Sequence, residues 1–114
     1  MRELLNVLKA TADQNRLRIL KMLQQKQMCV CELAAVLGIA QPSVSRHMAL
    51  LKNAGLVSDT REGQWIIYTI CDEKINEYAP AILKQLDHWV NDDTRIQQDL
   101  KKAHGLCRQD ICKK

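Results

Sequence analysis

The amino-acid sequence predicts a single, mainly α-helical domain that carries one β-hairpin. Four segments within the first 54 residues place apolar side chains at the three- and four-residue intervals of amphipathic helices. Two β-rich segments with a glycine between them follow, and helical patterning resumes after Asp72. A chain of 114 residues, 46% of them hydrophobic, can bury a core of its own without disulfides or structural metals.

The first two helices are expected over residues 2–10 and from Asp13 to about residue 24. The apolar side of the first is formed by Leu4, Leu5 and Leu8. Asp13 is a good N-cap, because its carboxylate can accept a hydrogen bond from a free backbone N–H of the first turn. Residues 25–28 are expected to form a polar connection.

Two further helices are expected over residues 30–37 and 41–54, with the turn Gly38-Ile39-Ala40 between them. Glycine commonly follows a helix in the left-handed conformation, and Pro42 is tolerated in a first turn. The buried stripe of the second helix would be Val44, Met48 and Leu51. This arrangement is a helix-turn-helix, although two ordinary packed core helices are the alternative.

The β-rich segments cover residues 56–60 and 64–71, with Arg61-Glu62-Gly63 as the hairpin turn. The hairpin follows the helix-turn-helix directly, so the predicted fold class is α+β, a winged helix-turn-helix. After Pro80 a heptad-like seam is expected, formed by Ile82, Leu86, Trp89, Asp93, Ile96 and Leu100. The domain is expected to span residues 1–103, and residues 104–114 to form a flexible tail that contains cysteines.

The predicted second helix of the helix-turn-helix keeps a set of polar side chains off its buried stripe, namely Gln41, Ser43, Ser45, Arg46 and His47. The N-terminal half of such a helix enters the major groove of double-stranded DNA. There Gln can bond to adenine and Arg to guanine, and Ser can contact bases or phosphates. Arg61 and Gln64 at the tip of the hairpin would contact the adjacent backbone or minor groove. The net charge of +4 permits this partner without establishing it.

Cys29 and Cys31 stand at the entrance of the first helix of this unit. Cys29-x-x-Glu32 has the spacing of a capping box, but a thiol replaces the usual hydroxyl. Loss of an N-cap oxygen costs about 1 kcal/mol, which indicates a role other than stability. Because thiolates select soft ions, we expect a soft-ion sensor beside a DNA-reading element.

Geometry restricts how the two thiols can act together. On a regular helix, side chains two residues apart point roughly 200° apart. Cys29 and Cys31 can therefore share one ion only if Cys29 lies outside the helix or the first turn unwinds. Two other interpretations remain open: a buried pair of small apolar residues, and a redox pair whose thiols oxidise.

Other function classes are disfavoured. The chain has no apolar run long enough to span a membrane and no basic segment followed by an apolar one at its start, so we expect a cytoplasmic protein without a membrane partner. In the reducing cytoplasm, five cysteines favour thiol chemistry over a disulfide framework. An enzyme is not expected, because the thiols are Cys-x-Cys rather than Cys-x-x-Cys, and neither a βαβ pattern nor a Gly-rich phosphate loop is present.

Several segments resemble the ArsR/SmtB family of winged-helix repressors, and in particular its arsenic-responsive branch. They cover most of the chain: residues 12–20 (ADQNRLRIL), 29–33 (CVCEL), 41–51 (QPSVSRHMALL), 54–57 (AGLV) and 61–65 (REGQW). The resemblance implies a homodimer that binds a palindromic operator and leaves it when arsenite or antimonite binds the thiolates, with no organic cofactor. It also implies dimerisation through the terminal helices, here through Leu4, Leu5, Leu8, Ile82, Leu86 and Trp89.

One position departs from the arsenic branch, which often carries a third cysteine three residues after the second. Here that position is Ala34. Candidate third ligands are Cys107 or Cys112 of the tail, an external thiol or water. Alternatively, the inducer is a methylated arsenical that needs only two thiols, another soft metal ion (Cd, Pb or Zn), or an oxidant.

Overall fold

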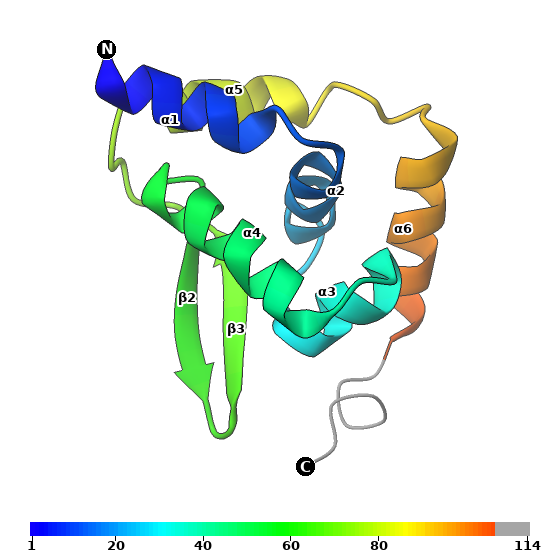
Figure 1. Ribbon diagram of the computed structural model, residues 1–114. Coiled ribbons are helices and arrows are strands. Elements are labelled where there is room, and N and C mark those ends of the chain that lie inside the picture. The colour runs from blue at the N-terminus through cyan, green and yellow to red at the C-terminus, as the bar shows by residue number, and fades with distance from the viewer. Residues whose placement is uncertain (107–114) are drawn as a thin grey trace.

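The computed structural model describes residues 1–106, and its elements follow the predicted order (Figure 1). The helices are α1 (Arg2–Thr11), α2 (Gln14–Leu23), α3 (Val30–Leu37), α4 (Gln41–Asn53), α5 (Tyr78–Leu86) and α6 (Thr94–Gly105). The strands are β1 (Met28–Cys29), β2 (Val57–Glu62) and β3 (Trp65–Ile70). No helix among the described residues is long and apolar enough to cross a membrane.

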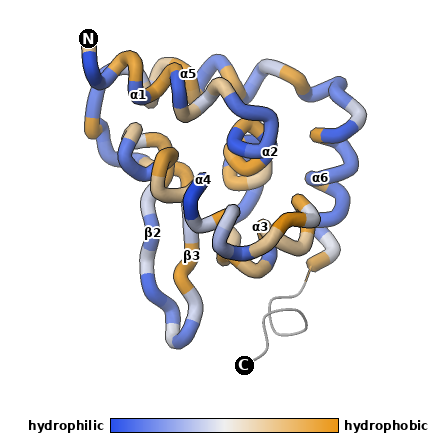
Figure 2. Tube along the Cα trace, in the orientation of Figure 1, coloured by the Kyte–Doolittle hydropathy of each residue, from blue (hydrophilic) through white to orange (hydrophobic). Residues whose placement is uncertain are grey.

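Helix α2 forms the centre of the molecule, and the other elements pack around it. Ile19, Leu20 and Met22 of α2 are fully buried. Figure 1 shows α1 and α5 side by side at one end, α6 along one side, and the β2–β3 hairpin projecting away from α4. Colouring by hydropathy shows hydrophobic residues along α2 and α3, whereas the end of the hairpin and much of α6 are hydrophilic (Figure 2).

The helix-turn-helix prediction is confirmed in position and in detail. Helix α3 ends at Gly38, which adopts the left-handed conformation with φ of 71°. Helix α4 begins at Gln41 with Pro42 in its first turn. The predicted stripe of α4 is fully buried, and it consists of Val44, Met48 and Leu51. Asp13 also caps α2 as expected, because its carboxylate accepts from the Arg16 backbone N–H at 3.0 Å.

The sheet has three antiparallel strands in the order β1-β3-β2. In the hairpin Glu62 pairs with Trp65, so the turn consists of Gly63 and Gln64 rather than residues 61–63. Gly63 has a φ of 63°, a conformation that glycine adopts without steric cost, and this fixes the tight turn one residue later than predicted.

Strand β1 corrects the prediction of a polar connection over residues 25–28. Met28 is fully buried and pairs with Tyr68 of β3, and Cys29 pairs with Ile67. A strand of two residues shows no alternation in its own sequence. Only its pairing with a strand about forty residues later in the chain reveals it.

The prediction of one continuous seam after Pro80 is wrong, because residues 87–93 separate α5 from α6. Asp93 is the N-cap of α6, and its carboxylate accepts from the Ile96 N–H at 3.1 Å. Val90 has a positive φ of 52°, which a helix cannot contain. The predicted seam therefore divides between two helices, and Trp89 lies in the connection between them.

Helix α6 is held on α2 by a buried ion pair. Arg18 Nε and Nη2 donate to the two carboxylate oxygens of Asp99 at 2.7 and 2.8 Å. This hydrogen bonding raises the pKa of Arg18 above its usual range. Helix α6 also extends through Gly105, two residues past the predicted domain boundary, while Cys107 and Cys112 lie outside the described residues.

Buried Lys21 of α2 contacts the connection between α5 and α6. Its Nζ donates to the Leu86 carbonyl at 2.8 Å and to Asn91 Oδ1 at 2.7 Å. Burial lowers the pKa of Lys21. Polar side chains of α2 thus fix the end of α5 and the helix that follows it.

Candidate nucleic-acid interface and thiol site

Helix α4 presents the predicted polar residues on its outer side. Gln41, Ser45 and Arg46 are exposed, and Ser43 and His47 are half-buried. The Arg46 guanidinium donates to Ser43 Oγ at 3.2 Å, which orients it along the N-terminal half of the helix. A rigid helix thus carries a row of hydrogen-bonding side chains, the arrangement that reads base edges in a major groove.

The hairpin lies beside this helix and is tied to it by an ion pair. Lys52 Nζ of α4 contacts both carboxylate oxygens of Asp59 on β2 at 3.1 Å. Arg61 and Gln64 are both exposed. Gln64 is in the turn, whereas Arg61 is within β2 and pairs with Ile66. The hairpin therefore extends away from α4 with an exposed cation near its end, as a wing beside a DNA groove would.

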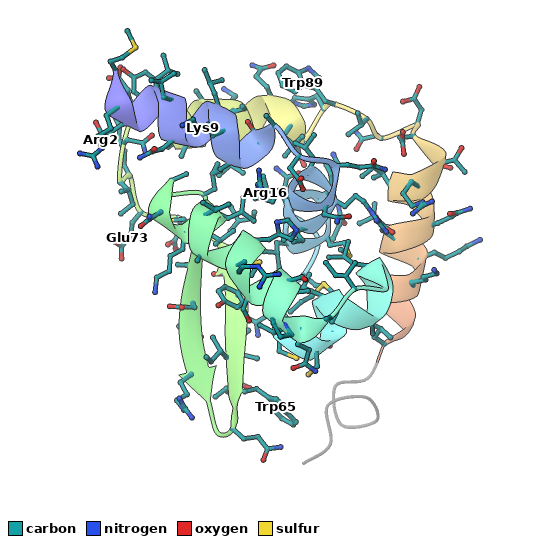
Figure 3. The ribbon with its side chains drawn as sticks, viewed as in Figure 1. Arg2, Lys9, Arg16, Trp65, Glu73 and Trp89 are labelled. Carbon is teal, nitrogen blue, oxygen red and sulfur yellow. The ribbon has the colours of Figure 1, made fainter. Side chains whose placement is uncertain are left out.

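His47 was predicted from the sequence as a DNA-facing residue of α4, but its partner Arg16 was not predicted. Arg16 Nη1 lies 3.1 Å from His47 Nδ1, and the same guanidinium donates to the carbonyls of Lys9 and Ala10. Figure 3 shows Arg16 between α1 and α4. The contact joins residues 31 positions apart, so no local pattern could have indicated it.

The two thiols lie together at the start of α3. The Cys29 and Cys31 sulfurs are 3.2 Å apart. Cys29 is the N-cap of α3 in an extended conformation, with φ of −92° and ψ of 169°, so it lies outside the helix, as a shared ion requires. The capping box also forms: Glu32 Oε1 accepts from the Cys29 backbone N–H at 2.9 Å.

The surroundings of the thiols connect the helix-turn-helix to the sheet. Cys29 is buried and packs with Ile67 of β3, and the half-buried Cys31 and Trp65 pack against this pair. An ion can bind here only while both cysteines are reduced, because the thiolate is the metal ligand. Within residues 1–106 no group of three or more metal-binding side chains is present.

The position three residues after Cys31 is Ala34, half-buried on α3 and unable to ligate an ion. Cys71 follows β3, and its thiol donates to the Glu73 carbonyl at 3.3 Å. The predicted ligands Cys107 and Cys112 lie outside the described residues. The described thiol site therefore supplies two sulfurs.

Helices α1 and α5 contact each other and leave large apolar side chains uncovered at that end of the molecule. Leu5 and Leu8 of α1 are each 47% exposed, and Trp89 is 50% exposed. Leu4 and Ile82 are half-buried, whereas Leu86 is buried within the protomer. Of the residues expected at a dimer interface, Leu86 thus belongs to the core of the single chain.

Comparison with known proteins agrees with this geometry. Residues 13–59, which run from the N-cap of α2 into β2, match the family described as bacterial regulatory protein, arsR family. The arsenic resistance transcriptional regulator ArsR1 of Pseudomonas putida is 38% identical over 82% of this chain and 78% of that protein. The arsenical resistance operon repressor of Escherichia coli K12 is 32% identical over 92% of this chain and 86% of that protein.

The fold also matches solved structures. The homodimeric winged helix-turn-helix DNA-binding domain of Mb0332 from Mycobacterium bovis superposes with a TM-score of 0.65 at 29% identity, over 76% of this chain and 77% of that one. Sequence and structure agree on the same helix-turn-helix and hairpin. The chain therefore belongs to the ArsR family of bacterial transcriptional regulators and has a winged helix-turn-helix fold.

Proposed function

We propose that this protein is a dimeric repressor that binds operator DNA through α4 and the hairpin and is released when trivalent arsenic or antimony binds Cys29 and Cys31. The observation that carries this proposal is the 3.2 Å separation of the two sulfurs at the first turn of the helix-turn-helix. It supports a pair of soft-ion ligands within the proposed DNA-reading unit.

The spacing of the sulfurs suits one bridging ion. With metal–sulfur bonds of about 2.3 Å and tetrahedral angles at the ion, two bound sulfurs lie about 3.8 Å apart. The two sulfurs are 3.2 Å apart, so a shift of about half an ångström would let both bind one ion. Soft trivalent arsenic and antimony favour thiolates over the oxygen ligands nearby. A third ligand would come from Cys107 or Cys112, an external thiol or water.

The path from the thiols to DNA is short. Cys29 is paired with β3, and Cys31 is in the first turn of α3, which packs directly on α4. An ion across these two residues takes the Cys29 sulfur from the capping box and fixes the strand end relative to the helix. We expect this to turn α3 and, with it, α4 out of the geometry that the groove requires.

Binding to two half-sites requires two copies of α4 at a fixed distance. The exposed Leu5, Leu8 and Trp89 near α1 and α5 form the apolar surface that a second copy would cover. A two-fold axis there makes the interface self-complementary, and the operator would then be palindromic.

The test uses fully reduced protein and a labelled duplex that the wild-type protein selects from a random DNA library. Release is followed by fluorescence anisotropy during titration with arsenite, antimonite, a monomethyl arsenical, Cd(II), Zn(II) and hydrogen peroxide. We expect release by arsenite and antimonite at the lowest concentrations. Release only by Cd(II) or Zn(II) would make the protein a metal-ion sensor, release only by peroxide a redox regulator, and either result overturns the arsenic assignment.

A further inference from the structure

Arg16 makes contacts with two helices that have different roles in the proposed function. Its Nε donates to the Ala10 carbonyl at 2.8 Å and its Nη2 to the Lys9 carbonyl at 3.1 Å. Both carbonyls belong to the last turn of α1, whose carbonyl end attracts cations, and the Lys9 carbonyl also accepts from the Ala12 backbone N–H at 3.2 Å. The third contact, from Nη1, is to His47 on α4.

The guanidinium determines the protonation pattern of the imidazole. Arginine has no acceptor and remains charged, so in the Arg16–His47 contact the nitrogen Nδ1 must accept. In this contact the ring therefore carries its proton on Nε2. Nε2 has no hydrogen bond to the described residues and is not among their buried unpaired atoms, so this N–H faces solvent.

The position of His47 on α4 allows this N–H to donate a hydrogen bond to DNA. His47 follows the exposed Arg46 on α4 and lies one turn after Ser43. A solvent-facing N–H on this side of the helix can donate to a phosphate oxygen, guanine N7 or O6, or thymine O4. It cannot accept from the amino groups of adenine or cytosine.

Side-chain packing alone does not join the two helices beside Arg16. A cavity of about 410 Å³ opens there, lined by residues of α1 and α4 together with Arg16. Its walls include Lys9, Leu50 and Asn53. Because this space is open, the planar, three-way contact of the guanidinium bridges α1 and α4 at this point.

We propose that Arg16 is a positioning residue for DNA recognition: it holds His47 as the Nε2–H tautomer, a fixed hydrogen-bond donor to DNA, and fixes α4 relative to α1. This inference rests on the proposed role of α4 in reading DNA. It predicts that Arg16 controls the preference for operator over random DNA, and not only the stability of the fold.

The first measurement needs no DNA. Long-range ¹H–¹⁵N NMR of histidine-labelled protein distinguishes the two neutral tautomers, and the His47→Gln variant identifies the His47 signals among the three histidines. We expect the Nε2–H tautomer alone in the wild type and a mixture in Arg16→Met. The Nδ1–H tautomer in the wild type would overturn the proposal, even if a variant failed to fold.

The second measurement uses the selected operator and random duplexes of the same length. Arg16→Met is expected to lower the ratio of the two affinities by tenfold or more, and Arg16→Lys to restore little of it, because an ammonium cannot make the directed fork. The matched control is Arg95→Met on α6, where Arg95 is exposed. It removes the same charge and should leave the ratio unchanged.

Two substitutions of His47 distinguish the roles of its two ring nitrogens. His47→Asn keeps an acceptor near the Nδ1 position and should bind the operator roughly 5- to 20-fold more weakly because it lacks the outer donor. His47→Gln keeps an outer donor but loses the Arg16 contact and should lose less affinity but more operator preference. Equal effects of both substitutions would contradict the proposal.

Arg46→Ala distinguishes failure of this inference from failure of the proposed function. If Arg46→Ala lowers the operator preference while Arg16→Met matches Arg95→Met, Arg16 has no positioning role and α4 still reads DNA. If Arg46→Ala also has no effect, then α4 is not the DNA-reading helix and both proposals are wrong.

Discussion

Cys29 and Cys31 are separated by one residue, yet their sulfurs lie 3.2 Å apart because Cys29 is held outside α3 as a strand residue. Pairing of Cys29 with Ile67 keeps its backbone extended, so its side chain is not subject to the helical rotation that would turn it away from Cys31. The sheet thus produces the geometry of the thiol pair.

The first prediction concerns the inducer thiols. Cys29→Ser and Cys31→Ser should each keep operator binding but require at least tenfold more arsenite for release, because a hydroxyl is a poor ligand for a soft ion. Cys29→Ser also places a good N-cap residue on α3, so its folding should not suffer. Anisotropy of labelled operator gives the readout.

Cys71→Ser is the matched control for these variants, because Cys71 lies beyond β3 and its thiol donates to the Glu73 backbone carbonyl, away from the Cys29–Cys31 pair. It should be released like the wild type. If both Cys29→Ser and Cys31→Ser leave the operator at the arsenite concentration that releases the wild-type protein, these two cysteines do not form the inducer site.

The second prediction separates base reading from backbone contact. Arg46→Ala should weaken operator binding by roughly 1–3 kcal/mol and reduce sequence preference. Arg61→Ala, near the end of the wing, should weaken all sequences alike and reduce the salt dependence of binding. Titrations at several salt concentrations with operator and random DNA measure both. A change in preference from Arg61→Ala and none from Arg46→Ala would reverse the two roles.

The third prediction concerns dimerisation. Leu8→Glu or Trp89→Glu should convert dimers into monomers, since a carboxylate would be buried against an apolar partner surface. Ile75→Glu is the control, because Ile75 is 55% exposed but lies outside α1 and α5. Sedimentation velocity gives the oligomeric state. Intact dimers in both test variants would place the interface elsewhere.

The fourth prediction concerns the third ligand. The Cys107→Ser/Cys112→Ser variant should bind arsenite more weakly and still be released through the remaining pair. Its response to a monomethyl arsenical should be nearly normal, because a carbon already occupies one position on arsenic. X-ray absorption should count three sulfurs around arsenic in the wild type and two in the variant. Three in both, without external thiols, would exclude the tail as the donor.

The fifth prediction concerns the ion pair between α2 and α6. Arg18→Met and Asp99→Leu should each lower the free energy of unfolding by about 3–5 kcal/mol, because each leaves one buried charge without its partner. The double variant should be more stable than either single variant. Denaturant unfolding monitored by circular dichroism measures this. Additive losses would show that the two side chains act independently.

Local patterns in the sequence were sufficient to predict the first four helices, the turn between α3 and α4, and the polar outer side of α4. Helical periodicity, the Asp13 cap and Gly38 are local signals, because each acts within a few residues of the chain. For the same reason the buried stripe of α4 could be predicted residue by residue. The resemblance of the motifs to one family was equally a property of contiguous segments.

The features that join distant parts of the chain arise only from tertiary packing. Strand β1 exists because Met28 and Cys29 pair with β3, and this pairing sets the thiol geometry. The apolar spacing after Pro80 is also compatible with one long helix, but Asp93 caps a new helix and Lys21 holds the connection before it. Arg16 reaches His47 only after α2 and α4 have packed. Such contacts produce no periodic pattern in the sequence. They depend on which distant segments the fold brings together, and not on residues that are neighbours in the chain.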